Sequence, residues 1–138
     1  MAQTWQQKLN AKKEPKLQLL QKAMAGIPAG GNLFFPTPQL IKEFMDRIPQ
    51  GSLVSLAEMR QQIAQAHEGD GCCPLMTSTS ARIVAEAAWE EIESGTKSEQ
   101  VTPFWRVIEP GSSIAQKLAC SSGFIEDMRK REGIIFVP

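Results

Sequence analysis

Three cysteines and a single histidine are the most direct candidates for nucleophiles or metal ligands in this sequence. Cys72 and Cys73 are adjacent, His67 lies shortly before them, and Cys120 stands alone. Adjacent thiolates fit one tetrahedral metal ion poorly, and the sequence has no Cys-x-x-Cys pair. An odd number of cysteines gives no disulfide framework. We therefore expect reduced, half-buried thiols and neither a metal nor another cofactor.

The basic run Arg129-Lys130-Arg131 is a second candidate binding feature, and Arg60, Lys97 and Arg106 extend it into a possible basic rim. Such a rim can bind phosphates, although a solvated charged face is the simpler interpretation. The chain carries 15 Lys and Arg against 15 Asp and Glu. A dedicated nucleic-acid binder usually has a basic excess. Any DNA contact should therefore be weak and come from a local patch.

The composition indicates one globular domain rather than a disordered or membrane protein. The chain has 138 residues, of which 42% are hydrophobic and 22% charged, and this length suits a single core. Its apolar stretches are far shorter than the roughly 20 residues that span a bilayer. Nothing resembles a signal peptide. We expect a cytoplasmic monomer with no membrane partner.

Capping signals and hydrophobic spacing predict three helices in the centre of the chain. Thr37-Pro38 is typical of a helix start, and Ser55-Leu56-Ala57-Glu58 has the pattern of a capping box. A third helix should be capped within residues 77–80 and end at Gly95. Its expected buried stripe consists of Ile83, Val84, Ala87, Ala88 and Ile92.

Shorter elements complete the expected order of a winged helix. We predict strands at residues 53–54, 101–108 and 134–137, and a last helix over 125–132 that Gly133 closes. Helix, strand, helix, loop, helix, strand is the order of that fold. The predicted fold class is mainly α with a small β wing, a winged helix-turn-helix over residues 37–138. An N-terminal helical or irregular extension, residues 1–36 with a short helix over 17–24, precedes it.

Four short segments resemble one protein family in their residues and in their order. They are Ile48-Pro49-Gln50-Gly51-Ser52-Leu53-Val54-Ser55, Ser80-Ala81-Arg82-Ile83-Val84-Ala85, Pro103-Phe104-Trp105-Arg106-Val107-Ile108 and Arg131-Glu132-Gly133. The third is the most specific, because it is similar to the active-site signature proline-cysteine-histidine-arginine-valine-isoleucine. Residues 38–133 thus resemble the winged-helix DNA-binding domain of the alkylguanine-DNA alkyltransferases, also known as methylated-DNA–cysteine methyltransferases.

The departures from the family pattern remove its chemistry. Phe104 occupies the position of the reactive cysteine and Trp105 that of the activating histidine, and Leu56 replaces a tyrosine. Alkyl transfer requires a thiolate and a neighbouring base. The chain therefore looks most like the non-enzymatic alkyltransferase-like proteins. In this resemblance Arg106 is structural, and Glu132 satisfies local amides rather than acting in a catalytic relay.

The resemblance also implies which residues contact DNA. Arg82 would enter the duplex and fill the gap left by a flipped base; otherwise it pairs with Glu86 four residues later. Ser55 and Ser80 would contact DNA at the starts of the two helices. The base pocket would consist of Phe104, Trp105, Ser122 and Gly123. The two aromatic rings would stack on the extruded base or simply fill the core.

Carboxylates on the expected recognition helix oppose this interpretation, because negative charge repels phosphates. The residues expected on its exposed side are Glu86, Glu90, Glu91 and Glu93. The first functional hypothesis is a non-catalytic DNA-repair or damage-recognition protein that binds DNA weakly at alkylated guanine or distorted bases. The alternative is a winged-helix protein-interaction or regulatory module without DNA binding. A residual transferase that uses Cys120 is a third hypothesis.

Overall fold

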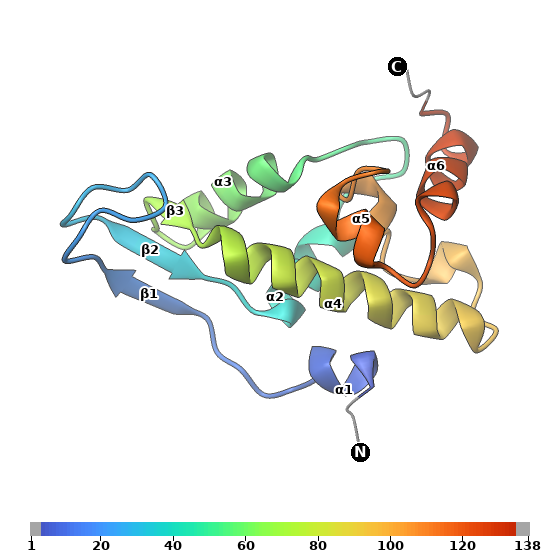
Figure 1. Cartoon of the computed structure of the whole chain (residues 1–138), viewed down its shortest axis with the longest axis horizontal. Helices are drawn as coiled ribbons and strands as arrows, with labels where there is room; N and C mark the ends of the chain where they lie inside the picture. The colour runs from blue at the N-terminus through green and yellow to red at the C-terminus, as the bar shows by residue number, and fades with distance from the viewer. Residues whose placement is uncertain (1–3, 135–138) are drawn as a thin grey trace.

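The computed structural model describes residues 4–134, which form a mainly helical molecule with one three-stranded sheet (Figure 1). The elements in chain order are α1 (Trp5–Leu9), β1 (Lys16–Leu19), β2 (Asn32–Phe35), α2 (Pro38–Asp46), α3 (Leu56–Ala66), β3 (Gly71–Cys72), α4 (Pro74–Glu93), η1 (Ser98–Gln100), η2 (Phe104–Arg106), α5 (Ser113–Lys117) and α6 (Ser122–Arg131). The two η elements are short 3-10 helices.

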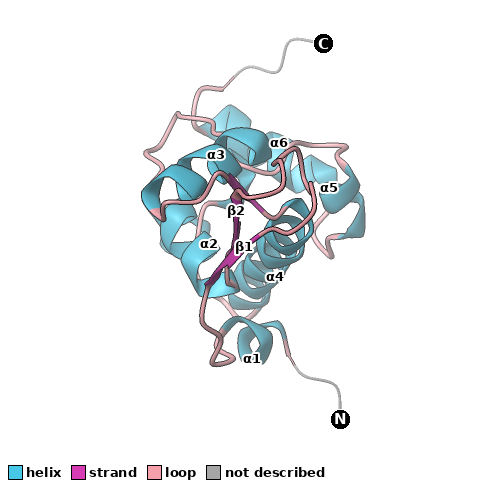
Figure 2. Ribbon diagram, turned by 90° about the vertical axis from the view of Figure 1, so that its left-hand side faces the viewer, coloured by secondary structure: helices cyan, strands magenta, loops and turns pink. Residues whose placement is uncertain are grey.

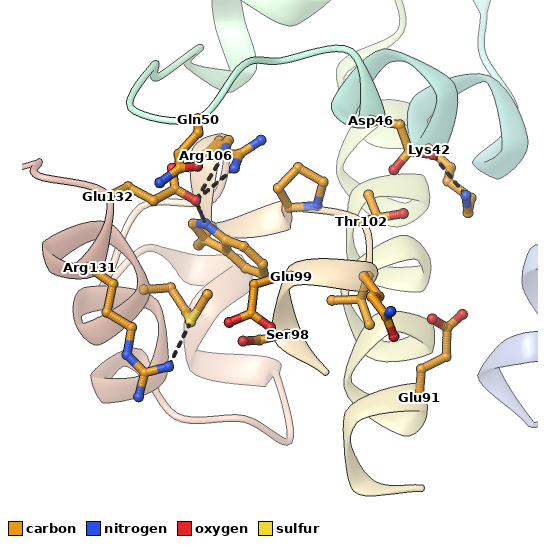
Figure 3. Close-up of a pocket in the computed structure, with 15 residues that line it drawn as sticks. Lys42, Asp46, Gln50, Glu91, Ser98, Glu99, Thr102, Arg106, Arg131 and Glu132 are labelled. Carbon is orange, nitrogen blue, oxygen red and sulfur yellow. Dashed lines mark hydrogen bonds and ion pairs between the residues drawn. The ribbon is translucent and has the colours of Figure 1, made fainter. Parts of the chain in front are cut away.

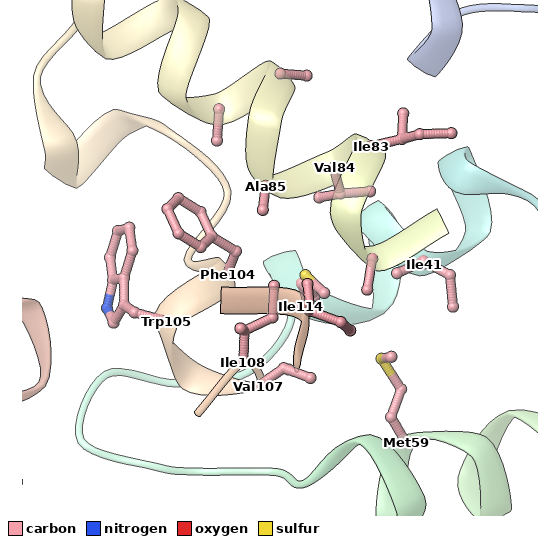
Figure 4. Packing of buried hydrophobic residues seen from close by; sticks show 14 of the residues in the cluster. Ile41, Met59, Ile83, Val84, Ala85, Phe104, Trp105, Val107, Ile108 and Ile114 are labelled. Carbon is pink, nitrogen blue, oxygen red and sulfur yellow. The ribbon is translucent and has the colours of Figure 1, made fainter. Parts of the chain in front are cut away.

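Helix α4 is the central element of the fold. It crosses the molecule, with the β1–β2 hairpin at one end and α6 toward the other (Figure 1). Several of its buried residues are small, which lets neighbouring helices approach closely: Ala81, Ala85, Ala87 and Ala88. Both α1 and α2 pack against it. The core between α2, α4 and η2 contains Ile41, Val84, Phe104 and Ile108, each at most 1% exposed (Figure 4).

The sheet connects the N-terminal extension to the start of α4. Strand β1 pairs antiparallel with β2, and β2 pairs parallel with the two-residue strand β3. Because β3 is followed almost at once by α4, these bonds fix the extension beside the helix. Viewed from the hairpin end, the strands lie with α2 and α3 on one side and α4 on the other (Figure 2). Leu9 and Phe34 are buried in the main core cluster.

The division of the chain at residues 36 and 37 stays a prediction. Two elements of the extension contact the rest of the chain: α1 packs against α4, and β2 pairs with β3.

Local signals predicted several helix ends correctly. Thr37 caps α2, its Oγ1 accepting a hydrogen bond from the Leu40 amide at 3.2 Å, and Pro38 is the first helical residue. Ser55 and Glu58 form the expected capping box of α3. Gly95 follows α4 with a φ of 105°, the left-handed conformation that favours glycine.

Other expected elements are wrong. Residues 17–24 do not form a helix, because residues 16–19 pair with β2 as strand β1. Residues 53–54 form no strand, although the Val54 amide donates to the Arg106 carbonyl at 2.9 Å. Residues 101–108 form no strand either, because Pro103 interrupts the extended backbone and the 3-10 turn η2 follows. The strand expected at 134–137 lies almost entirely outside the described residues.

The start of the third predicted helix is also corrected. Helix α4 begins at Pro74, and Cys73 is its N-cap. Residues 77–80 therefore lie inside the helix and do not cap it. The Thr77 hydroxyl donates to the Cys73 carbonyl at 2.8 Å, a contact within the helix. Arg82 consequently lies in the third turn of α4 rather than at its first turn.

The capping box gives a prediction on stability. The Ser55 Oγ accepts from the Glu58 amide at 3.0 Å, and a Glu58 oxygen accepts from the Ser55 amide at 3.3 Å. Ser55→Ala should lower the free energy of unfolding by about 1 kcal/mol, measured by urea denaturation with circular dichroism. Thr79→Ala, at an exposed position of α4, is the control and should change it by less than about 0.5 kcal/mol. Equal losses in the two variants would contradict the capping role.

Candidate functional site

The carboxylate of Glu132, at the C-cap of α6, accepts hydrogen bonds from three residues in two separate parts of the chain (Figure 3). Trp105 Nε1 donates to it at 2.7 Å. Arg106 donates from Nε at 2.9 and 3.1 Å and from Nη2 at 2.8 Å. The Gly51 amide donates at 3.1 Å. One side chain thus joins α6, η2 and the turn that precedes α3.

Arg106 extends this network to α2. Its Nη1 donates to the carbonyl of Ile48 at 2.6 Å, just after α2 ends. Its own carbonyl accepts from the Val54 amide at 2.9 Å. The bidentate ion pair between Arg106 and Glu132 fixes the relative orientation of the two side chains as well as pairing their charges. Arg106 therefore joins η2 to α6 and to the segment between α2 and α3.

The electrostatics of Glu132 favour its ionised form. The side chain is only 6% exposed, and this burial by itself raises the pKa of the carboxyl. The hydrogen bonds from Arg106, Trp105 and the Gly51 amide outweigh burial and hold the pKa below its usual value. The carboxylate is therefore ionised at neutral pH and serves as an acceptor.

Arg129, on the same helix, donates hydrogen bonds to two backbone carbonyls of the segment around η2. Its Nε donates to the carbonyl of Trp105 at 2.7 Å and its Nη2 to that of Ile108 at 3.1 Å. The residue is 8% exposed, and burial lowers the pKa of its guanidinium, against the opposing effect of Glu109. The prediction that residues 129–131 form a solvated basic face is therefore wrong for Arg129. Lys130 and Arg131 are exposed.

The aromatic residues expected to form a base pocket are buried. Phe104 is 0% and Trp105 2% exposed. Phe124, from α6, stacks against Phe104 with ring centroids 6.0 Å apart and packs edge-on against Trp105. In this conformation Phe104 has no exposed surface on which a base could stack. Sequence reasoning missed Phe124, although its place directly after Gly123 is a usable signal.

Ser122 and Gly123 are the first two residues of α6 and directly precede Phe124 in the sequence. The Ser122 hydroxyl accepts from the Gly111 amide at 3.0 Å, which ties α6 to the loop before α5. Gly123 is exposed. Helix α6 packs against η2, but the contacts of η2 with Phe124 involve neither Ser122 nor Gly123, and the side chains of Phe104 and Trp105 are buried in the core.

A cavity of about 580 Å³ reaches the outer side of this network between α2, α6 and residues 98–106 (Figure 3). Trp105, Arg106 and Glu132 contribute to its wall. Its lining carries both signs of charge, and Lys42 and Asp46 at its rim pair with each other at 2.8 Å. This cavity differs from the expected base pocket, because Phe104, Ser122 and Gly123 do not line it.

Arg82, on α4, lies between α1 and α5. Its side chain is 38% exposed, and its Nη2 lies 3.4 Å from the Lys117 carbonyl and 3.8 Å from a Glu86 oxygen. Its guanidinium also lies 5.2 Å from the centre of the Trp5 ring. The pair with Glu86 is the alternative that the sequence offered for this residue. Glu86 itself is only 4% exposed and accepts from the Ala119 amide at 2.9 Å, so its predicted place on the exposed face is wrong.

Helix α1 covers part of the remaining acidic face of α4. The Gln6 amide donates to Glu90 at 2.9 Å, and Gln6 Nε2 donates to the Ala87 carbonyl at 2.6 Å and to Glu91 at 3.3 Å. Both carboxylates are half-buried, whereas Glu93 is exposed as expected. The surface at this part of α4 is therefore formed by α1 as well as by the acidic side chains.

The two serines assigned to DNA contacts have different surroundings. Ser55 is half-buried, and its hydroxyl is used as the cap of α3. Ser80 is 1% exposed, and its hydroxyl has no hydrogen-bond partner among the described residues. In this conformation the Ser80 side chain does not reach the surface.

The two buried cysteines, Cys72 and Cys120, are poorly placed to act as nucleophiles. Burial raises the pKa of the Cys72 thiol, and burial together with Glu86 raises that of Cys120 to about 11. Residues 4–134 contain no group of three His, Cys, Asp or Glu side chains that could hold a metal ion. In the same range, no helix is both long and apolar enough to cross a bilayer.

Comparison with known proteins gives no relative. No protein-family model matches the chain, and neither a curated protein nor a solved structure matches it.

The Glu132 network predicts a pH-dependent contribution to stability. Glu132→Gln puts an amide donor where the donors of Arg106 and Trp105 need an acceptor, and should cost about 2–4 kcal/mol at pH 7. Because the folded pKa is lowered, this contribution is complete above the unfolded pKa of about 4.3 and is lost as the pH falls through the folded pKa.

Urea denaturation of both proteins between pH 3 and pH 8 measures this difference. The gap between wild type and Glu132→Gln should be constant above about pH 5 and shrink at lower pH. The control is Glu126→Gln, at an exposed position of the same helix, with a small and constant gap. A Glu132→Gln gap that does not change with pH would refute the ionised network.

Proposed function

We propose that this protein is a non-catalytic, alkyltransferase-like DNA-binding protein of the winged-helix type. The observation that carries the proposal is the convergence of the segments on which the family resemblance rests. Gly51, Trp105, Arg106 and Glu132 come from three of these segments and meet at one carboxylate. The remaining segment, residues 80–85, contributes to the same core cluster as Phe104. Such spatial convergence favours one inherited motif over four chance matches.

The same geometry favours binding over catalysis. Phe104 offers no nucleophile, and Trp105 cannot act as a base, because its indole nitrogen is a donor only and donates to Glu132. Cys120 is 2% exposed, with a raised pKa. A thiol needs a lowered pKa and access to its substrate to act as a nucleophile. Together these features support a protein that binds and does not react.

Arg82 is the residue that we propose for contact with alkylated or distorted bases. Its Nε is buried and has no hydrogen-bond partner among the described residues, and an unpartnered buried donor costs about 1–3 kcal/mol. Its contacts to Glu86 and to the Lys117 carbonyl are long, at 3.8 and 3.4 Å. A duplex phosphate would replace these long contacts by a shorter one and would leave the Ala119 amide as the donor to the buried Glu86 carboxylate.

Absence of alkyl transfer is the first test. The mass of the intact protein should stay unchanged after incubation with duplex containing alkylguanine or with free benzylguanine. The half-buried Cys73 should still react with a small thiol reagent, which shows that the protein is accessible to chemistry. A stoichiometric mass gain that disappears in Cys120→Ser would prove that a transferase activity remains.

Weak, salt-sensitive binding is the second test. The dissociation constant for duplex DNA should be in the range of non-specific binders, about 10⁻⁶ to 10⁻⁴ M, and should rise with salt. Fluorescence anisotropy of a labelled duplex at several salt concentrations measures it, and a duplex with one alkylated guanine should bind more tightly than its unmodified copy. No binding to either duplex at low salt would refute the DNA proposal.

The second candidate function is a protein-interaction module, and one observation favours it. Leu17 and Leu19 are 45% and 62% exposed on β1, an edge strand of the sheet. Exposed apolar residues on an edge strand are a template for pairing with another chain. This candidate gains support if neither duplex binds.

A further inference from the structure

Positive charge is concentrated at the N-terminal end of this chain. Residues 1–31 contain five lysines and one acidic residue, Glu14, whereas residues 32–138 contain ten basic and fourteen acidic residues. The overall balance that argues against DNA binding therefore hides a basic segment and an acidic body. The lysines are Lys8, Lys12, Lys13, Lys16 and Lys22.

Residues 8–19 of this basic segment are held against the rest of the molecule at both ends. At its start, Leu9 is 5% exposed in the core, and Gln6 forms three hydrogen bonds to α4. At its end, residues 16–19 pair with β2. Binding to residues 8–19 therefore requires little ordering of the chain, which reduces the entropic cost of association.

The lysine charges are free to act on a partner. Lys12, Lys13, Lys16 and Lys22 are exposed. Among the described residues no lysine of this segment forms an ion pair. Lys8 lies 4.1 Å from the centre of the Trp5 ring, a contact that leaves its charge uncompensated.

The segment is continuous with the surface around Arg82. Trp5 contacts Lys8 on one side and the Arg82 guanidinium on the other, and Arg82 bonds the carbonyl of Lys117. The acidic residues of α4 beside it are held by Gln6 or, in the case of Glu86, buried. Lys8, at the start of the segment, and Arg82 are therefore both close to the same Trp5 ring on α1.

We propose that the lysine-rich segment, residues 8–22, provides the main phosphate contacts of this protein with duplex DNA and holds the duplex beside Arg82. This inference rests on the proposed function and adds a surface that the family resemblance does not contain. Lysines that neutralise phosphates release counterions, and each contact adds about 0.9 to the slope of log affinity against log salt.

The test compares two double variants that have the same net charge. Lys12→Gln/Lys13→Gln removes two charges from the segment, and Lys42→Gln/Arg47→Gln removes two from α2 and its C-cap, which belong neither to the segment nor to the basic rim. Affinity for a labelled duplex is measured by anisotropy over a range of salt concentrations. The segment variant should bind more weakly and its slope should fall by up to about 1.8, whereas the control should keep the wild-type slope.

The outcomes separate this inference from the proposed function. If wild type binds duplex and the two variants weaken it equally, net charge alone acts and the inference is wrong, while the proposed function stands. If wild type binds no duplex, the proposed function fails. Anionic lipid vesicles are the parallel arm, because Leu17 and Leu19 are exposed beside the lysines. Binding to vesicles without binding to duplex would identify the segment as a membrane surface and overturn the inference.

Discussion

The arrangement of the second half of the chain depends on how the irregular segment around η2 satisfies its polar groups. This segment belongs to no sheet, and buried backbone amides and carbonyls require partners. Helix α6 supplies them from two side chains one turn apart. Arg129 donates to the carbonyls of Trp105 and Ile108, while Glu132 accepts from Trp105, Arg106 and Gly51. Because both charges are largely buried, a shift of α6 would leave them unpartnered at a cost of several kcal/mol.

The same packing explains why the expected pocket is filled. A pocket for a flipped base needs a void next to the reacting residue, yet Phe104 is fully buried and Phe124 stacks on it. Trp105 turns its indole N–H to the carboxylate of Glu132. Aromatic side chains at these two positions thus contribute apolar burial and one hydrogen bond to the core.

Sequence predicted what local chemistry determines and failed where distant residues decide. The caps at Thr37 and Ser55 and the left-handed Gly95 depend on neighbours within a few residues, and all three are present. The leucine-rich stretch at residues 17–20, which includes Gln18, fits a helix or a strand, and the pairing of residues 16–19 with β2 decides between them. Arg129 and Glu86 are charged and should be exposed on base rates. Their partners lie 21 or more residues away along the chain, and no periodicity reveals them.

Gln6 links the packing of α1 to the charge distribution of the whole molecule. The carboxylates of Glu90 and Glu91 need donors where α1 approaches α4, and lysines could have provided them. Instead a neutral amide side chain and a backbone N–H do so. Glu90 and Glu91 of α4 therefore receive hydrogen bonds from neutral donors. Within residues 4–134, the lysines of the N-terminal segment form no ion pair with them. A chain with no net charge can in this way present an uncompensated basic surface, so net charge alone is a poor guide to what it binds.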